Sequence, residues 1–115
     1  MVVSLSSKEL RADENGFGKG SLRINIPEGY HINSSDPPAR WLVPTKIEIS
    51  PLKARIDYPA ADADSYRGEI DIPFSVELPK GESGADFELV VSYQACTEQE
   101  CLLAEEKRFS AVLVR

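Results

Sequence analysis

The residues with the clearest capacity for chemistry are two cysteines, Cys96 and Cys101, which lie five positions apart. Two thiols can form a disulfide and exchange electrons with a thiol of another protein. On a helix, residues at this spacing would be about 7.5 Å apart along the axis and rotated by about 140°. That separation exceeds the roughly 7 Å between Cα atoms that a disulfide tolerates. If the two thiols pair, the segment between them must therefore be a tight loop.

A disulfide at this spacing would contribute little to the stability of the fold. The loop-entropy model assigns about 2.2 kcal/mol to a closed loop of roughly six residues, and such a bond joins no distant elements. The spacing also differs from the C-x2-C of thioredoxin-like enzymes. Three interpretations stay open on these grounds: a redox-active pair, a local structural disulfide, and two free thiols in the core.

Glutamates crowd the cysteine pair in the sequence, at positions 98, 100, 105 and 106. Nearby carboxylates disfavour a thiolate, which is the reactive form of cysteine. We therefore expect the pair to exchange electrons only when a partner supplies the reactive thiol. Such a domain would not turn over alone.

The length and charge of the chain limit the classes of function. Its 115 residues fit a single domain, and the net charge of −6 argues against nucleic acid or anionic lipid as a partner. No apolar run is long enough to span a membrane. One histidine and two cysteines do not fill a four-ligand zinc site, so we expect no metal and no cofactor.

The first residues lack a secretory signal, and we expect residues 1–115 to be one domain excised from a longer precursor.

Alternating apolar and polar residues predict β-strands. The alternation is strictest from Ile70 to Leu78, where Pro73 lacks a backbone donor, so this strand is expected at a sheet edge or weakly paired there. Shorter runs with the same period lie at residues 22–26, 47–49, 52–58, 87–93 and 109–113. Turn signals separate the runs. We predict an all-β, immunoglobulin-like β-sandwich of about seven to nine short antiparallel strands.

One segment departs from the strand pattern. Residues 97–100 (Thr-Glu-Gln-Glu) have the form of a capping box, and residues 101–108 are mostly helix formers. We therefore expect one short helical turn near the cysteine loop.

Several motifs together resemble one known family. They are Gly-Tyr-His-Ile-Asn-Ser at 29–34, Trp-Leu-Val-Pro-Thr at 41–45, Tyr-Arg-Gly-Glu at 66–69, and Tyr-Gln-Ala-Cys at 93–96 followed by Cys101-Leu102. In this order they resemble the N-terminal periplasmic domain of the thiol:disulfide interchange protein DsbD. The resemblance covers nearly the whole chain from Gly20 onward.

The resemblance implies a periplasmic, monomeric thiol–disulfide exchange domain in which Cys96 and Cys101 are the active pair. Such a domain relays electrons from a thioredoxin-like or membrane reductase domain to partner proteins. Periplasmic disulfide isomerases and cytochrome c maturation proteins are the partners that the family implies. In the family the second cysteine makes the mixed disulfide, which corresponds to Cys101 here.

The resemblance also implies roles for residues outside the cysteine pair. His31, Asn33, Tyr93 and Gln94 are expected to neighbour the redox site. Family members shield their sulfurs with a mobile cap loop, and residues 56–65, with Tyr58 and Pro59, occupy the corresponding stretch. The strand alternation allows an alternative in which Tyr58 only ends a buried face.

The chain departs from the family after the second cysteine. Leu102-Leu103-Ala104 replaces the proline-containing stretch that commonly follows that cysteine, which leaves the identity of the partner open. Elsewhere in the motifs, we expect Trp41 to pack in the core or under a loop.

A different function is also possible for these residues. The alternative is a non-catalytic β-sandwich that binds another protein through a strand edge or loop end, with the cysteines as a local clip.

Overall fold

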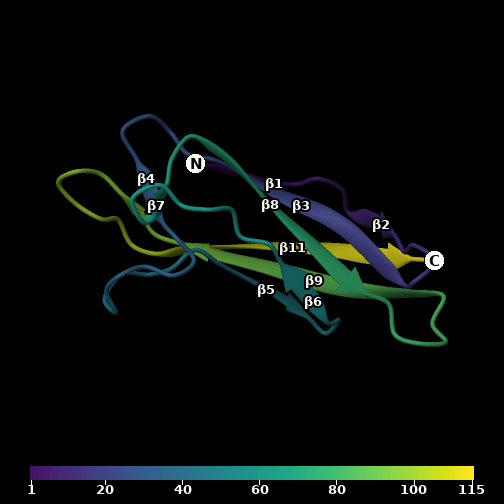
Figure 1. The fold of residues 1–115 in the computed structure, drawn as a ribbon. Helices are drawn as coiled ribbons and strands as arrows, with labels where there is room; N and C mark the ends of the chain where they lie inside the picture. Colours follow the sequence, from purple (N-terminus) through teal and green to yellow (C-terminus); the bar gives the residue numbers. More distant parts are fainter.

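The computed structural model describes all 115 residues and contains eleven β-strands and no helix. In chain order the strands are β1 (Val2–Leu5), β2 (Glu9–Arg11), β3 (Phe17–Asn25), β4 (His31–Asn33), β5 (Lys46–Ser50), β6 (Ala54–Ile56), β7 (Ser65–Tyr66), β8 (Glu69–Glu77), β9 (Gly84–Tyr93), β10 (Ala95–Cys96) and β11 (Glu105–Val114). Figure 1 shows an elongated molecule, with extents of 52 × 24 × 21 Å. No helix is present that could cross a membrane.

Two four-stranded sheets form the body of the molecule, with strand orders β1-β3-β8-β6 and β2-β11-β9-β5. Their inward side chains make one apolar core, in which Leu22 and Ile72 of the first sheet and Leu89 and Leu113 of the second are fully buried. This arrangement confirms the immunoglobulin-like β-sandwich. The strands outnumber the expected ones because several, such as β7 and β10, have only two or three residues and produce no alternating pattern.

A third, small sheet lies at one end of the sandwich, with strand order β10-β4-β7 (Figure 1). β10 follows directly from the long strand β9, so the second sheet leads into this small sheet. The register pairs Ala95 with Ile32 and Cys96 with His31 on one side of β4. On the other side it pairs Ile32 with Tyr66. The small sheet therefore joins three segments that are distant in the sequence.

The position of β8 differs from the expected sheet edge. β8 lies inside the first sheet, between β3 and β6. Pro73 is opposite Ser21 of β3, and its carbonyl accepts a hydrogen bond from the Asp57 N–H, 2.9 Å away, just beyond the end of β6. The missing N–H of Pro73 would point to the same side, where the pairing with β6 has already ended. An interior strand can therefore contain the proline.

The expected helical turn near the cysteines is absent. The helix formers at positions 105–108 belong to β11, which pairs with β9 over ten positions, from Glu105 opposite Tyr93 to Val114 opposite Gly84. Intrinsic helix propensity differs little between these residues and strand formers, and a continuous ladder on β9 outweighs it.

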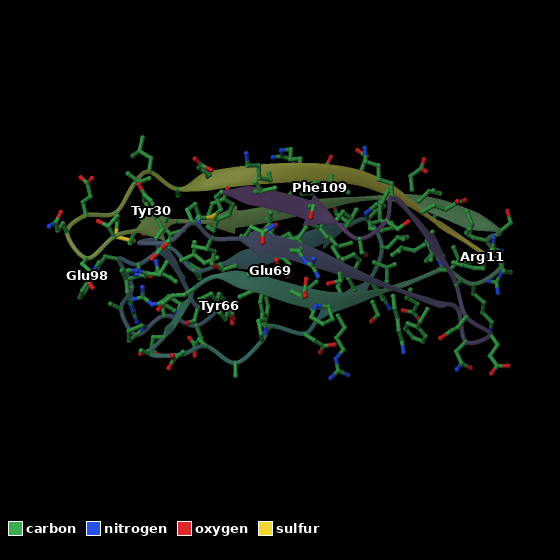
Figure 2. All side chains as sticks on the ribbon, turned by 90° about the horizontal axis from the view of Figure 1, so that it is seen from above. Arg11, Tyr30, Tyr66, Glu69, Glu98 and Phe109 are labelled. Atoms are coloured by element: carbon green, nitrogen blue, oxygen red, sulfur yellow. A yellow bond between two sulfur atoms is a disulfide. The ribbon has the colours of Figure 1, made fainter.

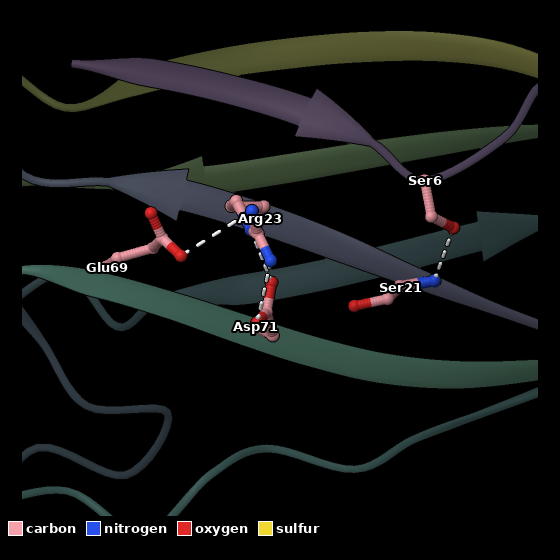
Figure 3. Close-up of polar contacts among 5 residues, drawn as sticks. All are labelled: Ser6, Ser21, Arg23, Glu69 and Asp71. Atoms are coloured by element: carbon pink, nitrogen blue, oxygen red, sulfur yellow. Dashed lines mark hydrogen bonds and ion pairs between the residues drawn. The ribbon is translucent and has the colours of Figure 1, made fainter.

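The outer face of the first sheet carries an ion-pair cluster. Arg23 Nε lies 2.9 Å from Asp71 Oδ1, and Arg23 Nη1 lies 3.5 Å from Glu69 (Figure 3). The hydrogen bond from Arg23 holds the pKa of the Asp71 carboxyl below its usual value. Nearby, the Ser21 N–H donates to Ser6 Oγ. These exposed contacts connect β3 to β8 and to the residue that follows β1.

Candidate functional site

The two cysteines form a disulfide, with their Cα atoms 4.0 Å apart, and the chain has no free cysteine. The chain reverses between them, because the Thr97 N–H donates to the Glu100 carbonyl at 2.7 Å. Cys96 and Cys101 are directly opposite each other as an antiparallel bridge. The segment is the tight loop that a bond at this spacing requires, and the interpretation as two free thiols is wrong.

The loop keeps part of the capping pattern without forming a helix. Thr97 Oγ1 accepts hydrogen bonds from the backbone N–H groups of Gln99 and Glu100, at 3.2 and 3.1 Å. On the other side of the disulfide, the Leu102 N–H donates to the Ala95 carbonyl at 2.8 Å. These backbone bonds on both sides make residues 95–102 a hairpin, which is called the cysteine hairpin below. The Thr side chain that would begin a helix satisfies the donors of a turn instead.

β4 places His31 directly beside the disulfide. His31 is opposite Cys96 in the antiparallel pair β4–β10, so the two side chains project from the same face of the small sheet. Asn33 shares this face because side chains two residues apart on a strand point the same way. Ile32 points to the other face and is fully buried in the core. The structure thus brings together three of the residues expected at the site.

A polar network supports this face of the small sheet. The buried Asn33 donates from Nδ2 to the Val43 carbonyl at 2.9 Å, and Gln94 Oε1 lies 3.5 Å from the same nitrogen. Gln94 Nε2 donates to the Leu102 carbonyl at 3.2 Å. Thr45, also fully buried, donates from Oγ1 to the Asn33 carbonyl at 2.6 Å. Gln94 and Asn33 therefore hold the cysteine hairpin, β4 and residues 43–45 together.

The electrostatic surroundings of His31 favour the neutral form of its imidazole. Burial lowers the pKa of His31 below its usual value, the positive charge of Arg67 lowers it further, and the carboxylate of Glu98 opposes these effects. Arg67 is the residue that follows β7. If the β4–β7 pairing continued by one residue, Arg67 would lie opposite His31. Nδ1 of His31 is buried and has no hydrogen-bond partner.

Tyr93, the last residue of β9, lies near the cysteine hairpin. Its side chain is buried, and its hydroxyl donates to Glu105 Oε2 at 2.8 Å, which links the end of β9 to the start of β11. Burial, together with this hydrogen bond and the charge of Glu105, raises the pKa of Tyr93 well above its usual value. A small groove of about 280 Å³, lined by Tyr30, Tyr93, Ala95, Leu102 and Leu103 among others, lies on this side.

The segment expected to form a cap is attached to the body of the domain. Tyr58 packs against the core, and its hydroxyl accepts a hydrogen bond from the Ile47 N–H at 2.9 Å. The Pro59 carbonyl accepts one from the Tyr66 hydroxyl at 3.0 Å. This contact connects the segment to β7, which is separated from β10 by β4 in the small sheet.

Exposure differs sharply around the disulfide. Cys96 is 2% exposed, whereas Cys101 is exposed. Leu103, at 90%, and Trp41, at 82%, are the most exposed large apolar residues, and Leu102 is exposed as well. The expectation that Trp41 packs in the core or under a loop is wrong. Figure 2 shows the yellow sulfurs at the same end of the molecule as Tyr30, Tyr66 and Glu98, with Arg11 at the other end.

Sequence reasoning missed several residues of the site. The charge of Arg67, the residue that follows β7, acts on His31, and Val43 contributes through its backbone carbonyl, which no residue type reveals. The exposed pair Leu102-Leu103 did carry a signal, since two leucines stand in an otherwise polar segment. No cluster of three or more His, Cys, Asp or Glu side chains that could hold a metal ion is found.

The fold and the disulfide define a class of protein: an immunoglobulin-like domain that carries one disulfide hairpin at its end. The family model for "Thiol:disulfide interchange protein DsbD, N-terminal" matches residues 6–113, and the chain belongs to this family. The description of this family and the Cys96–Cys101 disulfide support an assignment as a thiol–disulfide exchange domain.

A solved structure, the N-terminal periplasmic domain of ScsB from Proteus mirabilis, has a similar fold, with a TM-score of 0.63 and 14% sequence identity. The match covers 91% of this chain and 43% of that chain, so the present domain spans less than half of the solved one. No curated protein matches the sequence.

Proposed function

We propose that the domain relays electrons in the periplasm by cycling the Cys96–Cys101 pair between disulfide and dithiol. A thioredoxin-like or membrane reductase domain would reduce the pair. The pair would then reduce partner proteins of the periplasmic disulfide isomerase or cytochrome-maturation type. The observation that carries the proposal is the asymmetry of the pair, with an exposed Cys101 bonded to a buried Cys96 in a hairpin at the end of the sandwich.

The chemistry of one cycle follows from this asymmetry. A thiolate of the reductase attacks the exposed Cys101 sulfur, the bond to Cys96 breaks, and the Cys96 sulfur takes up a proton. The second thiol of the reductase then attacks the mixed disulfide and releases reduced Cys101, so two electrons and two protons enter the domain. Cys101 attacks the disulfide of the next partner, and Cys96 resolves the mixed disulfide to restore the starting bond.

Single cysteine variants test the assignment of the attacked sulfur. We expect Cys96→Ala, which keeps Cys101, to form a stable mixed disulfide with a thioredoxin-like protein activated at its cysteine by a thionitrobenzoate group. Cys101→Ala, which keeps only the buried sulfur, should react at least about tenfold more slowly, because reaction rate depends on access. A mixed disulfide that forms through Cys96 and not through Cys101 would overturn the assignment.

The non-catalytic alternative is tested by the reduction potential of the pair. Structural disulfides of secreted proteins lie below about −300 mV, and exchangeable ones lie higher. We expect a value above about −300 mV, and a folded Cys96→Ala/Cys101→Ala variant, because the short loop contributes little to stability. A lower potential together with an unfolded double variant would identify the bond as a structural clip.

We also propose that residues 56–65 form a cap that shields the disulfide. Its position beside β7, at the same end as the disulfide, supports a shielding role. The contacts of Tyr58 with the core and with Ile47 support the alternative in which this ring only anchors the segment. Shielding by the Tyr58 ring itself would require the hydroxyl to leave the Ile47 N–H.

A further inference from the structure

We propose that Nδ1 of His31 accepts a hydrogen bond from the Cys96 thiol in the reduced domain, and takes that proton when Cys96 attacks the mixed disulfide at Cys101. This inference rests on the proposed function, and it assigns to the only histidine of the chain a role in one step of the cycle.

The strand register supplies the geometry. Cys101, Cys96 and His31 are successive directly opposed residues across the cysteine hairpin and β4. Opposed side chains in antiparallel strands share a face, with Cβ atoms about 5 Å apart. The imidazole thus stands beside Cys96 on the side away from Cys101, where it does not block the disulfide and stays next to the sulfur when the bond opens.

The hydrogen-bond inventory of the site points to the same pairing. Buried polar atoms are nearly always paired, and an orphan calls for an explanation. Nδ1 of His31 is the only buried side-chain nitrogen or oxygen in the chain without a partner. The polar side chains next to it along the sheet, Asn33 and Gln94, are already engaged with Val43 and Leu102. In the oxidised form the Cys96 sulfur has no proton, and reduction creates the missing donor.

The protonation state of His31 suits this role. Burial and Arg67 hold its pKa below the usual value against the opposing charge of Glu98, so at neutral pH one ring nitrogen is free to accept. Cys96 is almost fully buried, and a buried thiol ionises with difficulty. Acceptance of its proton by Nδ1 therefore assists the attack: the Cys96–Cys101 bond forms, the partner sulfur leaves, and the proton passes from the imidazole to solvent.

The test measures how fast the mixed disulfide is resolved. The wild-type domain is reduced and then mixed with an oxidised thioredoxin-like protein. This protein carries either a thionitrobenzoate mixed disulfide or its own disulfide. The amount of covalent complex is followed over time by acid quenching and gel electrophoresis. We expect His31→Phe to slow resolution about a hundredfold or more, within the range typical of lost general-base assistance, while formation of the complex through Cys101 is unchanged.

Two further variants separate proton transfer from a polar contact. His31→Asn keeps a polar atom near the position of Nδ1, and His31→Gln keeps one near Nε2, but neither amide can take a proton. We expect both variants to resolve the complex as slowly as His31→Phe, and a rate restored by either one would show that proton transfer to His31 is not needed. The ¹⁵N chemical shift of Nδ1 should also move toward that of a hydrogen-bonded acceptor nitrogen when the wild-type domain is reduced.

The outcomes distinguish this inference from the proposed function. If the wild-type domain forms no mixed disulfide at Cys101, the exchange function itself fails. If the complex forms normally, and His31→Phe is folded by thermal melting but resolves the complex at the wild-type rate, the role of His31 is wrong. Identical Nδ1 shifts in the two redox states would overturn it as well.

Discussion

Cys96 and Cys101 share one covalent bond but occupy different surroundings. The buried Cys96 is bordered by His31, while the exposed Cys101 is followed by exposed apolar residues. A partner sulfur can therefore reach Cys101, whereas the chemistry of Cys96 depends on what the domain itself provides. This division of roles makes single-residue substitutions informative, because each changes one half of the exchange.

His31 makes the stability of the domain depend on pH. Its pKa is lowered in the folded protein from an ordinary value of 6.5, so the unfolded chain binds more protons below that pH. The stabilising effect is complete above pH 6.5 and is lost as the pH falls toward the lowered pKa of the folded state. We expect the free energy of unfolding in urea to decrease between pH 7.5 and pH 5 by a smaller amount in His31→Phe than in the wild type. Equal decreases in the two proteins would contradict this.

At the scale of elements, the pairing between distant strands decides the secondary structure where it conflicts with local sequence signals. The alternation in Ile70–Leu78 correctly predicts β8, and the cysteine spacing correctly predicts a tight loop. The helix formers at 105–108 are misleading, because what decides their state is the neighbouring strand β9. Pro73 correctly indicates weak pairing at its own position but not the interior place of β8, because the pairing depends on where β6 ends. Register across distant strands, which brings His31 to Cys96, has no signature in one sequence.

The segment before β7 provides a prediction about an element. Tyr58 anchors the segment to β5 through the Ile47 N–H, so Tyr58→Ala should free the segment and expose the reduced thiols. We expect reaction of these thiols with a small disulfide reagent to become severalfold faster, and the free energy of unfolding to fall by about 2 kcal/mol. Tyr58→Phe removes only the hydroxyl, and should cost about 1 kcal/mol with a smaller change in thiol reactivity. A stability loss in Tyr58→Ala with unchanged thiol reactivity would show that this segment shields nothing.

At the scale of the whole molecule, exposed apolar side chains collect at the end that carries the disulfide. Leu102 and Leu103 directly follow Cys101, and Trp41 lies in the loop that leads to Val43, next to the same polar network. Glu98 and Glu100 are exposed in the cysteine hairpin. We expect a protein that bonds to the Cys101 sulfur to cover the residues that follow it. In that case the two leucines would form a small apolar docking surface with an acidic border.

Leu103 tests this view of the molecule. Because its side chain is 90% exposed, Leu103→Ser should leave the free energy of unfolding within about 0.5 kcal/mol of the wild type. We expect it to slow exchange with a protein partner severalfold, because a partner bound at Cys101 loses apolar contact. Exchange with a small thiol such as glutathione should not change, since such a molecule needs no docking surface.

Phe17→Ser is the matched control, because Phe17 is also partly exposed but lies at the start of β3, far from β4 and the hairpin. Equal slowing by both variants, or slowing with glutathione as well, would show that Leu103 acts on the fold or on the sulfurs and not on the partner.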